Sequence, residues 1–279
     1  MNAYGVVLCG GRGSRLRPLS YYIPKPMVPI GRREKPLLEY ILRLMAFHGL
    51  KDVLLLVGYK GNQIRNYFRD GSFLGLRLSY AYDDKDFPGT GGAVFNALRL
   101  GLLPKDGIIL IYYGDILSDI NLKEMLKVHC SSGAAVTLAV STAYRLPVSV
   151  AKLNRDRIIG FEEKPALRLP VGIGILAVES ETLQYIANLH RKGHDLDLMR
   201  DFIPYLIEQG MPVKAYVTDA FWLDIGSLEK YEKLDHDDVE RRFAFLFKGE
   251  DRIEIYYCLL YTSDAADDGE SVDLGGRRI

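Results

Sequence analysis

Short apolar runs alternate with amphipathic segments through the first 115 residues of the chain. Each apolar run has the length of one buried strand, and each amphipathic segment carries its apolar residues at helical spacing. The predicted strands are 4–8, 52–59, 76–82 and 108–113, and the predicted helices are 36–45, 61–68 and 88–100. Regular alternation of strands and helices is typical of a parallel sheet with right-handed crossovers. We therefore expect an α/β fold with a Rossmann-like, mixed but mainly parallel sheet that is flanked by helices.

The pattern changes after a predicted helix over 121–128, where turn residues separate shorter runs. The predicted strands here are 134–141, 148–153, 157–161, 171–178, 213–217 and 221–225, and the predicted helices are 121–128, 181–189, 198–209 and one that starts at 228 with Ser227 as its N-cap. No linker separates the two halves, so we expect a single domain over 1–240. It would hold one lobe over about 1–115 and an inserted lobe over about 116–235, with a helix or strand extension over 241–257.

The first predicted strand leads into a loop that is rich in glycine and arginine. It reads Leu-Cys-Gly-Gly-Arg-Gly-Ser-Arg-Leu-Arg-Pro-Leu from 8 to 19, and Pro-Lys-Pro-Met follows from 24 to 27. Glycines let the backbone approach a ligand closely, and successive N–H groups can face an anion. The arginines add positive charge, and Lys25 adds a point charge between two prolines that stiffen its backbone. These features suit the binding of a triphosphate.

Two common phosphate loops do not fit this stretch. A P-loop ends in Gly-Lys-Ser/Thr, which is absent here. The dinucleotide fingerprint needs a third glycine where Arg15 stands and a helix directly after it, whereas prolines at 18, 24, 26 and 29 keep this chain irregular. The alternative without function is a loop that merely turns the chain.

Two aspartates interrupt apolar runs near predicted strand ends. Asp115 follows the strand 108–113, and Asp224 is the one acid in the run 221–225. A carboxylate in such a place is costly unless it has a partner or a role. Mg²⁺ prefers one or two carboxylates together with phosphate oxygens and water. We therefore predict that Asp115 and Asp224 form a metal pair, and the alternative is that each caps a turn or a helix.

The glycine loop and several later motifs resemble the sugar-1-phosphate nucleotidyltransferase family. The family's loop reads Gly-Gly-x-Gly-Ser/Thr-Arg-Leu-x-Pro-Leu and is followed by Pro-Lys-Pro-Met/Leu. Gly114-Asp115, Glu163-Lys164-Pro165 and Trp-Leu-Asp-Ile-Gly at 222–226 match the family's later motifs in the right order. The resemblance covers most of residues 3 to 235, and it is strongest to the mannose-1-phosphate guanylyltransferases and their heptose relatives.

This resemblance implies a reaction and a set of site residues. The first lobe would bind an NTP, preferably GTP, and the inserted lobe a sugar 1-phosphate, preferably mannose 1-phosphate, with Mg²⁺ as the cofactor. The nucleotide would be held by Leu8, Gly10, Gly11, Gly13, Ser14, Arg15, Gly89, Thr90 and Gly91. The catalytic residues would be Arg15 at the leaving pyrophosphate, Lys25 at the α-phosphate, and Asp115 and Asp224 as Mg²⁺ ligands. The sugar phosphate would be bound by Glu163, Lys164 and Gly174.

Two positions in the acceptor half depart from the family pattern. Gly172 stands where the family has an asparagine that touches the sugar, and Ser149 stands where the family has a glycine. The sugar is therefore left open, and a thymidylyl-, uridylyl- or adenylyltransferase for glucose 1-phosphate is the main alternative. A non-catalytic, nucleotide-sensing paralogue is another. A glycosyltransferase is disfavoured, because the Ile-Leu-Ser-Asp that follows Asp115 does not give its Asp-x-Asp spacing.

Composition excludes several classes of partner. The formal net charge is zero, so no overall field draws the chain to nucleic acid or to an anionic membrane. The longest apolar runs are too short to span a bilayer, and the N-terminus does not read as a secretory signal. The chain has 3 cysteines, which form no disulfide framework and favour the cytoplasm. A homo-oligomer is left open.

The remaining titratable residues carry weaker signals. His190 and His194 would lie one turn apart on a helix, as metal ligands can, but we expect them on a solvated face. Three aspartates are expected to be helix caps or helix charges: Asp195, Asp197 and Asp201. The other histidines are expected at the surface or at helix ends: His48, His129 and His236.

The last 22 residues, 258–279, resemble the translation of a sequencing-library transposon end and its adapter. We interpret this segment as read-through that did not evolve to fold, and we exclude it from the fold prediction. The alternative is an ordinary acidic tail. The natural continuation of the chain after Tyr257 is left open, a further C-terminal domain included.

Overall fold

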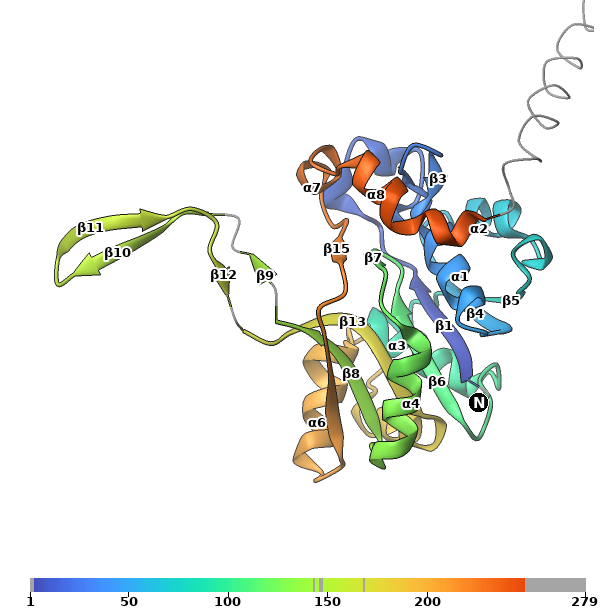
Figure 1. Cartoon of the computed structure of the whole chain (residues 1–279). Coiled ribbons are helices and arrows are strands. Elements are labelled where there is room, and N and C mark those ends of the chain that lie inside the picture. Colours follow the sequence, from blue (N-terminus) through green and yellow to red (C-terminus); the bar gives the residue numbers. More distant parts are fainter. Residues whose placement is uncertain (1–2, 143, 146–147, 168, 249–279) are drawn as a thin grey trace, which may run out of the picture.

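The computed structural model describes residues 3–142, 144–145, 148–167 and 169–248 (Figure 1). The expected read-through and the second part of the expected extension, 249–257, lie outside these residues. Within them, no helix is both long enough and apolar enough to cross a bilayer.

A seven-stranded sheet with the order β14-β8-β13-β6-β1-β4-β5 forms the body of the molecule. Its strands are β1 (Ala3–Cys9), β4 (Asp52–Val57), β5 (Arg77–Tyr82), β6 (Ile108–Tyr113), β8 (Val136–Ser141), β13 (Val171–Glu179) and β14 (Val213–Thr218). Only β13 runs antiparallel to its neighbours within this sheet. The predicted mixed, mainly parallel α/β fold is therefore confirmed. Strands from both expected lobes join this one sheet, and the lobe boundaries themselves stay a prediction.

Helices cover both faces of the sheet, because its buried strands carry apolar side chains on both sides. In β1, Val6 and the next residue, Val7, enter two different core clusters on opposite faces. Tyr40 of α1 and Phe243 of α8 pack in the cluster of Val7, and Val94 of α3 packs in the cluster of Val6. The α-helices are α1 (Leu37–Phe47), α2 (Gly61–Phe68), α3 (Gly89–Arg99), α4 (Leu122–Ser132), α5 (Ile186–Leu189), α6 (Ile203–Glu208), α7 (Leu228–Glu232) and α8 (His236–Phe243).

Two predicted helices are less regular than expected. The predicted helix 181–189 is a 3₁₀ helix, Ser180–Tyr185, that continues into α5. The predicted helix 198–209 begins as a π turn, Leu198–Phe202, and only then becomes α6. Pro204 lies in the first turn of α6, where a missing N–H is tolerated. The predicted N-cap of α7 is confirmed, because Ser227 Oγ accepts from the N–H of Lys230 at 3.4 Å.

A two-part arm projects from the body between β8 and β13 (Figure 1). Its inner part pairs β9 (Tyr144–Arg145) with β12 (Ala166–Leu167), and its outer part is the hairpin of β10 (Val150–Asn154) and β11 (Arg157–Glu162). The hairpin's apolar side chains are exposed, as those of Leu153 and Phe161 are. Two further short pairs of strands are β2 (Pro29–Ile30) with β3 (Lys35–Pro36) and β7 (Ile116–Ser118) with β15 (Trp222–Asp224). The described residues also form the 3₁₀ turns Ser14–Leu16, Leu19–Tyr21, Lys25–Met27, Ser72–Leu74 and Ala244–Phe247.

The histidine predictions need two corrections. His129 lies in the last turn of α4 but is buried and not at the surface, with Nδ1 2.8 Å from Thr137 Oγ1 and Nε2 3.2 Å from Glu179. Burial holds the pKa of this imidazole below its usual range, because the charged form would lose its hydration. His190 does not lie on a solvated helical face, since α5 ends at Leu189 and the ring of His190 stacks on Phe87 with centroids 4.7 Å apart. His48 and His236 lie at helix ends, as predicted.

Candidate active site

A cavity of about 760 Å³ opens at the carboxyl ends of β1, β5 and β6. Parallel strands present their carboxyl ends at one edge of a sheet, so loops that are far apart in the sequence meet there. The cavity is lined by Leu8 to Arg15, Lys25, Pro26, Leu56, Asp83 to Lys85, Phe87 to Thr90, Ala93, Tyr113 to Asp115, Asp195 and Gly226. Most of the predicted nucleotide-binding residues are therefore in one place.

The glycine loop is shaped by close packing at Gly10 and by an unusual backbone angle at Gly13. A Cβ atom on Gly10 would overlap the carboxylate of Asp83, so only glycine fits against this side chain. Gly13 has φ +60°, a left-handed conformation that L side chains rarely adopt, and it starts the 3₁₀ turn that carries Ser14 and Arg15. Gly11 lines the cavity, and a Cβ atom on it would meet nothing within 4 Å.

Lys25 holds two carboxylates at the inner end of this loop. Its side chain is buried, with the residue only 8% exposed. Its ammonium group donates to Asp115 Oδ2 and lies 3.7 Å from Asp224 Oδ1. The two aspartates are adjacent because β7 and β15 pair, which places Asp224 opposite Ile116 and lets the N–H of Ile225 donate to the Asp115 carbonyl at 3.0 Å. The predicted strand-end carboxylates therefore face the same cation.

The donor set around Asp224 fits a divalent metal. Asp224 Oδ2 accepts from Lys230 Nζ at 2.8 Å, while Oδ1 is buried and accepts no hydrogen bond. The Lys25 ammonium group at 3.7 Å balances the charge of this oxygen, and a bound cation would give it a direct contact as well. Nowhere in the described part of the chain do three or more His, Cys, Asp or Glu side chains gather as a metal site. Two carboxylates would leave the other positions of Mg²⁺ to phosphate and water, as this ion prefers.

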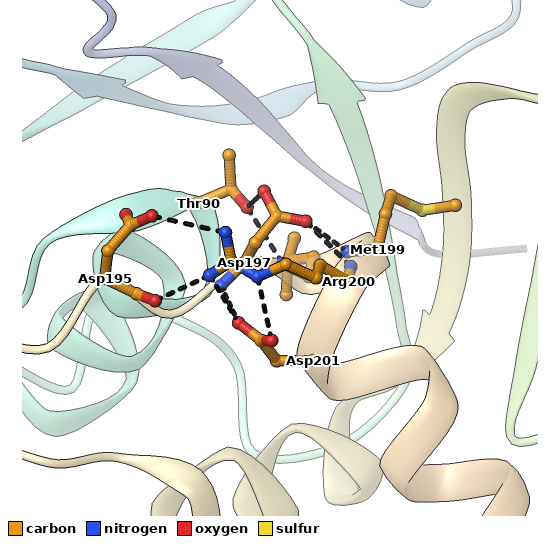
Figure 2. A network of polar contacts seen from close by, with 7 residues as sticks. Thr90, Asp195, Asp197, Met199, Arg200 and Asp201 are labelled. Carbon is orange, nitrogen blue, oxygen red and sulfur yellow. Dashed lines mark hydrogen bonds and ion pairs between the residues drawn. The ribbon is translucent and has the colours of Figure 1, made fainter.

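The turn 88–92 reaches the cavity through Gly89 and Thr90. The Thr90 hydroxyl is already engaged, because it donates to Asp197 Oδ2 and accepts from the N–H of Leu198, both at 2.9 Å (Figure 2). The N–H of Gly91 donates to the Leu196 carbonyl at 2.8 Å, and Gly91 is not among the cavity-lining residues. The Thr90 hydroxyl proton is therefore already used, and Gly91 lies behind the turn.

The predicted sugar-phosphate residues are not gathered at this cavity. Glu163 and Lys164 lie on the arm with side chains 69% and 63% exposed, and Glu163 accepts a hydrogen bond from Ser149. The arm leads away from the body (Figure 1). Gly174 is closer, since a Cβ on it would lie 3.1 Å from the ring of Tyr113, which lines the cavity. At Gly172, a Cβ would lie 3.2 Å from both Leu138 and Met199, so a larger residue would need these side chains to move.

Several cavity residues were missed by the sequence analysis. Asp83 directly follows the predicted strand 76–82, so its strand-end position was a usable signal. Burial against Gly10 and Gly58 raises the pKa of the Asp83 carboxyl, because its charged form loses hydration on that side. Tyr113 is the last residue of the predicted strand 108–113, so its strand-end position was a usable signal too. Asp195 was predicted to be a helix cap or a helix charge, and nothing in the local sequence showed that its loop reaches the cavity.

The fold and the site together define an α/β protein with a cavity at the carboxyl ends of its strands, where a glycine- and arginine-rich loop lies beside a lysine-bridged pair of carboxylates. A family model described as nucleotidyl transferase matches residues 4–241. The chain therefore belongs to the nucleotidyl transferase family, as its resemblance to the sugar-1-phosphate nucleotidyltransferases predicted.

Curated relatives carry several different substrate names. The chain is 32% identical to the UTP–glucose-1-phosphate uridylyltransferase of a Synechocystis strain, over 81% of this chain and 61% of that protein. It is 32% identical to the mannose-1-phosphate guanylyltransferase of Mycobacterium tuberculosis, over 84% of this chain and 64% of that protein. The chain thus spans less than two thirds of these two relatives. It is 30% identical to the D-glycero-α-D-manno-heptose 1-phosphate guanylyltransferase of Campylobacter jejuni, over 81% of this chain and 96% of that protein.

Solved structures share the fold. A putative glucose-1-phosphate thymidylyltransferase from Bacillus anthracis superposes with a TM-score of 0.64 at 20% identity, covering 88% of this chain and 96% of that one. HddC from Yersinia pseudotuberculosis superposes with a TM-score of 0.62 at 22% identity, covering 84% of this chain and 97% of that one. These likenesses support the nucleotide-diphospho-sugar transferase type of fold.

Proposed function

We propose that this protein transfers a nucleotidyl group from an NTP to a sugar 1-phosphate, giving an NDP-sugar and pyrophosphate. The observation that carries the proposal is the cluster of Lys25, Asp115 and Asp224 at the inner end of the glycine loop. Binding of a nucleotide alone does not need a buried cation between two carboxylates. Group transfer uses such a cation, because negative charge builds up on the phosphates during the reaction. The curated relatives named above carry this type of activity in their names.

The reaction is a displacement at the α-phosphorus of the NTP. A phosphate oxygen of the sugar 1-phosphate forms the new P–O bond, the bond from the α-phosphorus to the bridging oxygen breaks, and pyrophosphate leaves with its electron pair. The attacking phosphate is ionised near neutral pH, so no general base is needed. Lys25 would stabilise charge at the α-phosphate and Arg15 charge on the leaving pyrophosphate, while the glycine loop holds the triphosphate still. Bound between Asp115 and Asp224, Mg²⁺ would neutralise phosphate charge.

Glu163, Lys164 and Gly174 would bind the acceptor. Lys164 would grip the sugar phosphate and Glu163 would accept from sugar hydroxyl groups. Because both side chains lie on the arm, this role requires the arm to approach the cavity when the acceptor binds. The proposed setting is the cytoplasm, with NTP and sugar 1-phosphate as small-molecule partners.

GTP and mannose 1-phosphate are the proposed substrate pair. Guanine offers two adjacent donors, N1–H and the N2 amino group, which match the two oxygens of one carboxylate. Asp83 lines the cavity beside the glycine loop, and in this proposal its carboxylate would accept both donors. Adenine and uracil lack such a pair of neighbouring donors. The names of the guanylyltransferase relatives point the same way, whereas the uridylyltransferase relative keeps UTP and glucose 1-phosphate as the alternative.

Replacing Asp83 with asparagine should reduce selectivity for GTP. We expect kcat/KM for GTP to fall about tenfold to a hundredfold, since a charge-assisted pair of hydrogen bonds is lost, while kcat/KM for UTP changes less than about threefold. Steady-state kinetics with both nucleotides measure this.

Burial raises the pKa of Asp83, so its carboxyl group takes up a proton at a higher pH than an ordinary aspartate does. As the pH is lowered, the GTP selectivity of the unaltered protein should therefore begin to fall at a correspondingly higher pH. Equal losses for GTP and UTP would contradict the assignment.

The proposed activity is tested by pyrophosphate release from the full chain with Mg²⁺. Each NTP is crossed with the 1-phosphates of mannose, glucose, N-acetylglucosamine and heptose. Turnover with one pair supports the proposal and identifies the substrates. Nucleotide binding without turnover for any pair would favour the nucleotide-sensing paralogue.

A further inference from the structure

The loop that carries Asp195 is docked on the beginning of α3, the turn that reaches the proposed nucleotide site. The N–H of Leu196 donates to the Pro88 carbonyl at 3.1 Å, and the Leu196 carbonyl accepts from the N–H of Gly91 at 2.8 Å. A Cβ atom on Gly89 would overlap the Leu196 carbonyl, so glycine permits this close approach. The loop and the turn therefore form one wall of the cavity.

Arg200 fixes the position of Asp195 within this wall (Figure 2). Its Nη2 donates to the Asp195 carbonyl at 2.7 Å, and its Nη1 lies 3.5 Å from Asp195 Oδ2. On its other side, the guanidinium group donates to both oxygens of Asp201, at 3.0 and 2.8 Å. Asp201 in turn accepts from the N–H of Asp197 at 2.8 Å. One planar group thus holds both the backbone and one carboxylate oxygen of Asp195 in place.

The carboxylate of Asp195 is open to the cavity. The residue lines the cavity, its side chain is 65% exposed, and its Oδ1 lies against Gly89. The phosphate end of the cavity is marked by Lys25 and the arginines of the glycine loop. A carboxylate would repel phosphate, so Asp195 is suited to a different part of a substrate. Hydroxyl groups donate hydrogen bonds to carboxylates, and a sugar ring presents several.

We propose that Asp195 binds hydroxyl groups of a sugar ring of the substrate and that Arg200 is the positioning residue that holds it there. This inference rests on the proposed function and names a specificity determinant of the same site. The hydroxyl groups belong either to the ribose of the NTP or to the acceptor sugar, and the experiment distinguishes the two.

The test measures kcat and KM of the full chain for Asp195→Ala, Arg200→Met and the double variant. We expect Asp195→Ala to raise one KM about tenfold with kcat changed less than about threefold, since a hydrogen bond to a charged group is lost. Arg200→Met should raise the same KM, and the double variant should be no worse than Asp195→Ala, because Arg200 acts through Asp195. Arg200→Lys should recover part of the loss, as it retains a donor.

Substrate analogues identify which ring is bound. If the ribose is bound, KM for the NTP rises and Asp195→Ala no longer distinguishes the NTP from its 2′-deoxy or 3′-deoxy analogue. If the acceptor sugar is bound, KM for the sugar 1-phosphate rises instead. Asp52→Asn and Arg77→Gln serve as the matched control, because these two side chains form an exposed two-bond pair at the amino ends of β4 and β5, away from the cavity.

Two outcomes would overturn the assignment. In the first, both KM values for Asp195→Ala stay within twofold of those of the unaltered protein. In the second, Arg200→Met lowers Tm, and its effects on every kinetic parameter add to those of Asp195→Ala. Equilibrium binding of NTP by calorimetry is measured in parallel. An unaltered chain that binds and turns over nothing would overturn the proposed function itself, and the Asp195 assignment with it.

Discussion

Replacing Lys25 with methionine is expected to lower kcat for pyrophosphate release by about a hundredfold to a thousandfold. The substitution keeps an unbranched side chain of similar length and removes the charge that faces both Asp115 and Asp224. A fixed cation at the α-phosphate acts mainly in the transition state, so kcat should fall more than KM rises. Steady-state kinetics with saturating Mg²⁺ measure the effect.

Lys230 offers the matched control for this prediction. Its ammonium group also contacts Asp224, at 2.8 Å, but its side chain is 48% exposed and it does not line the cavity. Lys230→Met removes a charge from the same carboxylate, and we expect its kcat to change less than about tenfold, because exposed ion pairs contribute little. Equal losses in the two variants would show that Lys25 acts only through Asp224 and would contradict its role at the α-phosphate.

Asp115→Asn and Asp224→Asn are each expected to lower turnover by about a thousandfold, since each removes a charged ligand from the proposed Mg²⁺ pair. The Mg²⁺ concentration for half-maximal activity should rise in both variants, which a purely structural role would not produce. Thermal unfolding with and without Mg²⁺ adds a second readout. The Tm gain on adding Mg²⁺ and NTP should shrink in both variants.

Asp106→Asn is the control for the carboxylate variants. Asp106 is exposed and lies just before β6, at the edge of the sheet opposite the cavity. Its substitution should leave turnover and the Mg²⁺ dependence within about twofold. If Asp224→Asn retained the Mg²⁺ dependence of the unaltered protein, the two-carboxylate metal site would be wrong, and Asp224 would serve to position Lys25 and Lys230.

The amino-acid sequence by itself determined the class of fold and that the glycine loop lies at a strand end, where it lines the cavity. Strands and helices alternate with their own periodicities, so the elements around the glycine loop follow from local pattern. The loop's residues are consecutive, and their proximity needs no tertiary information. The sequence marked Asp115 and Asp224 as strand-end carboxylates, but the antiparallel pairing of β7 with β15, outside the seven-stranded sheet, brings them together.

Only the tertiary structure decided where the more distant parts of the chain lie. Side-chain contacts across large sequence separations place Asp195 in the cavity wall and occupy the Thr90 hydroxyl with Asp197. The burial of His129 also depends on tertiary contacts, because its two ring nitrogens lie beside Thr137 and Glu179 of neighbouring strands. The sequence predicts the outer part of the arm that carries Glu163 and Lys164 as two ordinary strands. The pairing of these strands does not determine the direction in which the hairpin projects. Local pattern fixes which element a residue belongs to, whereas packing between elements fixes which residues share a site.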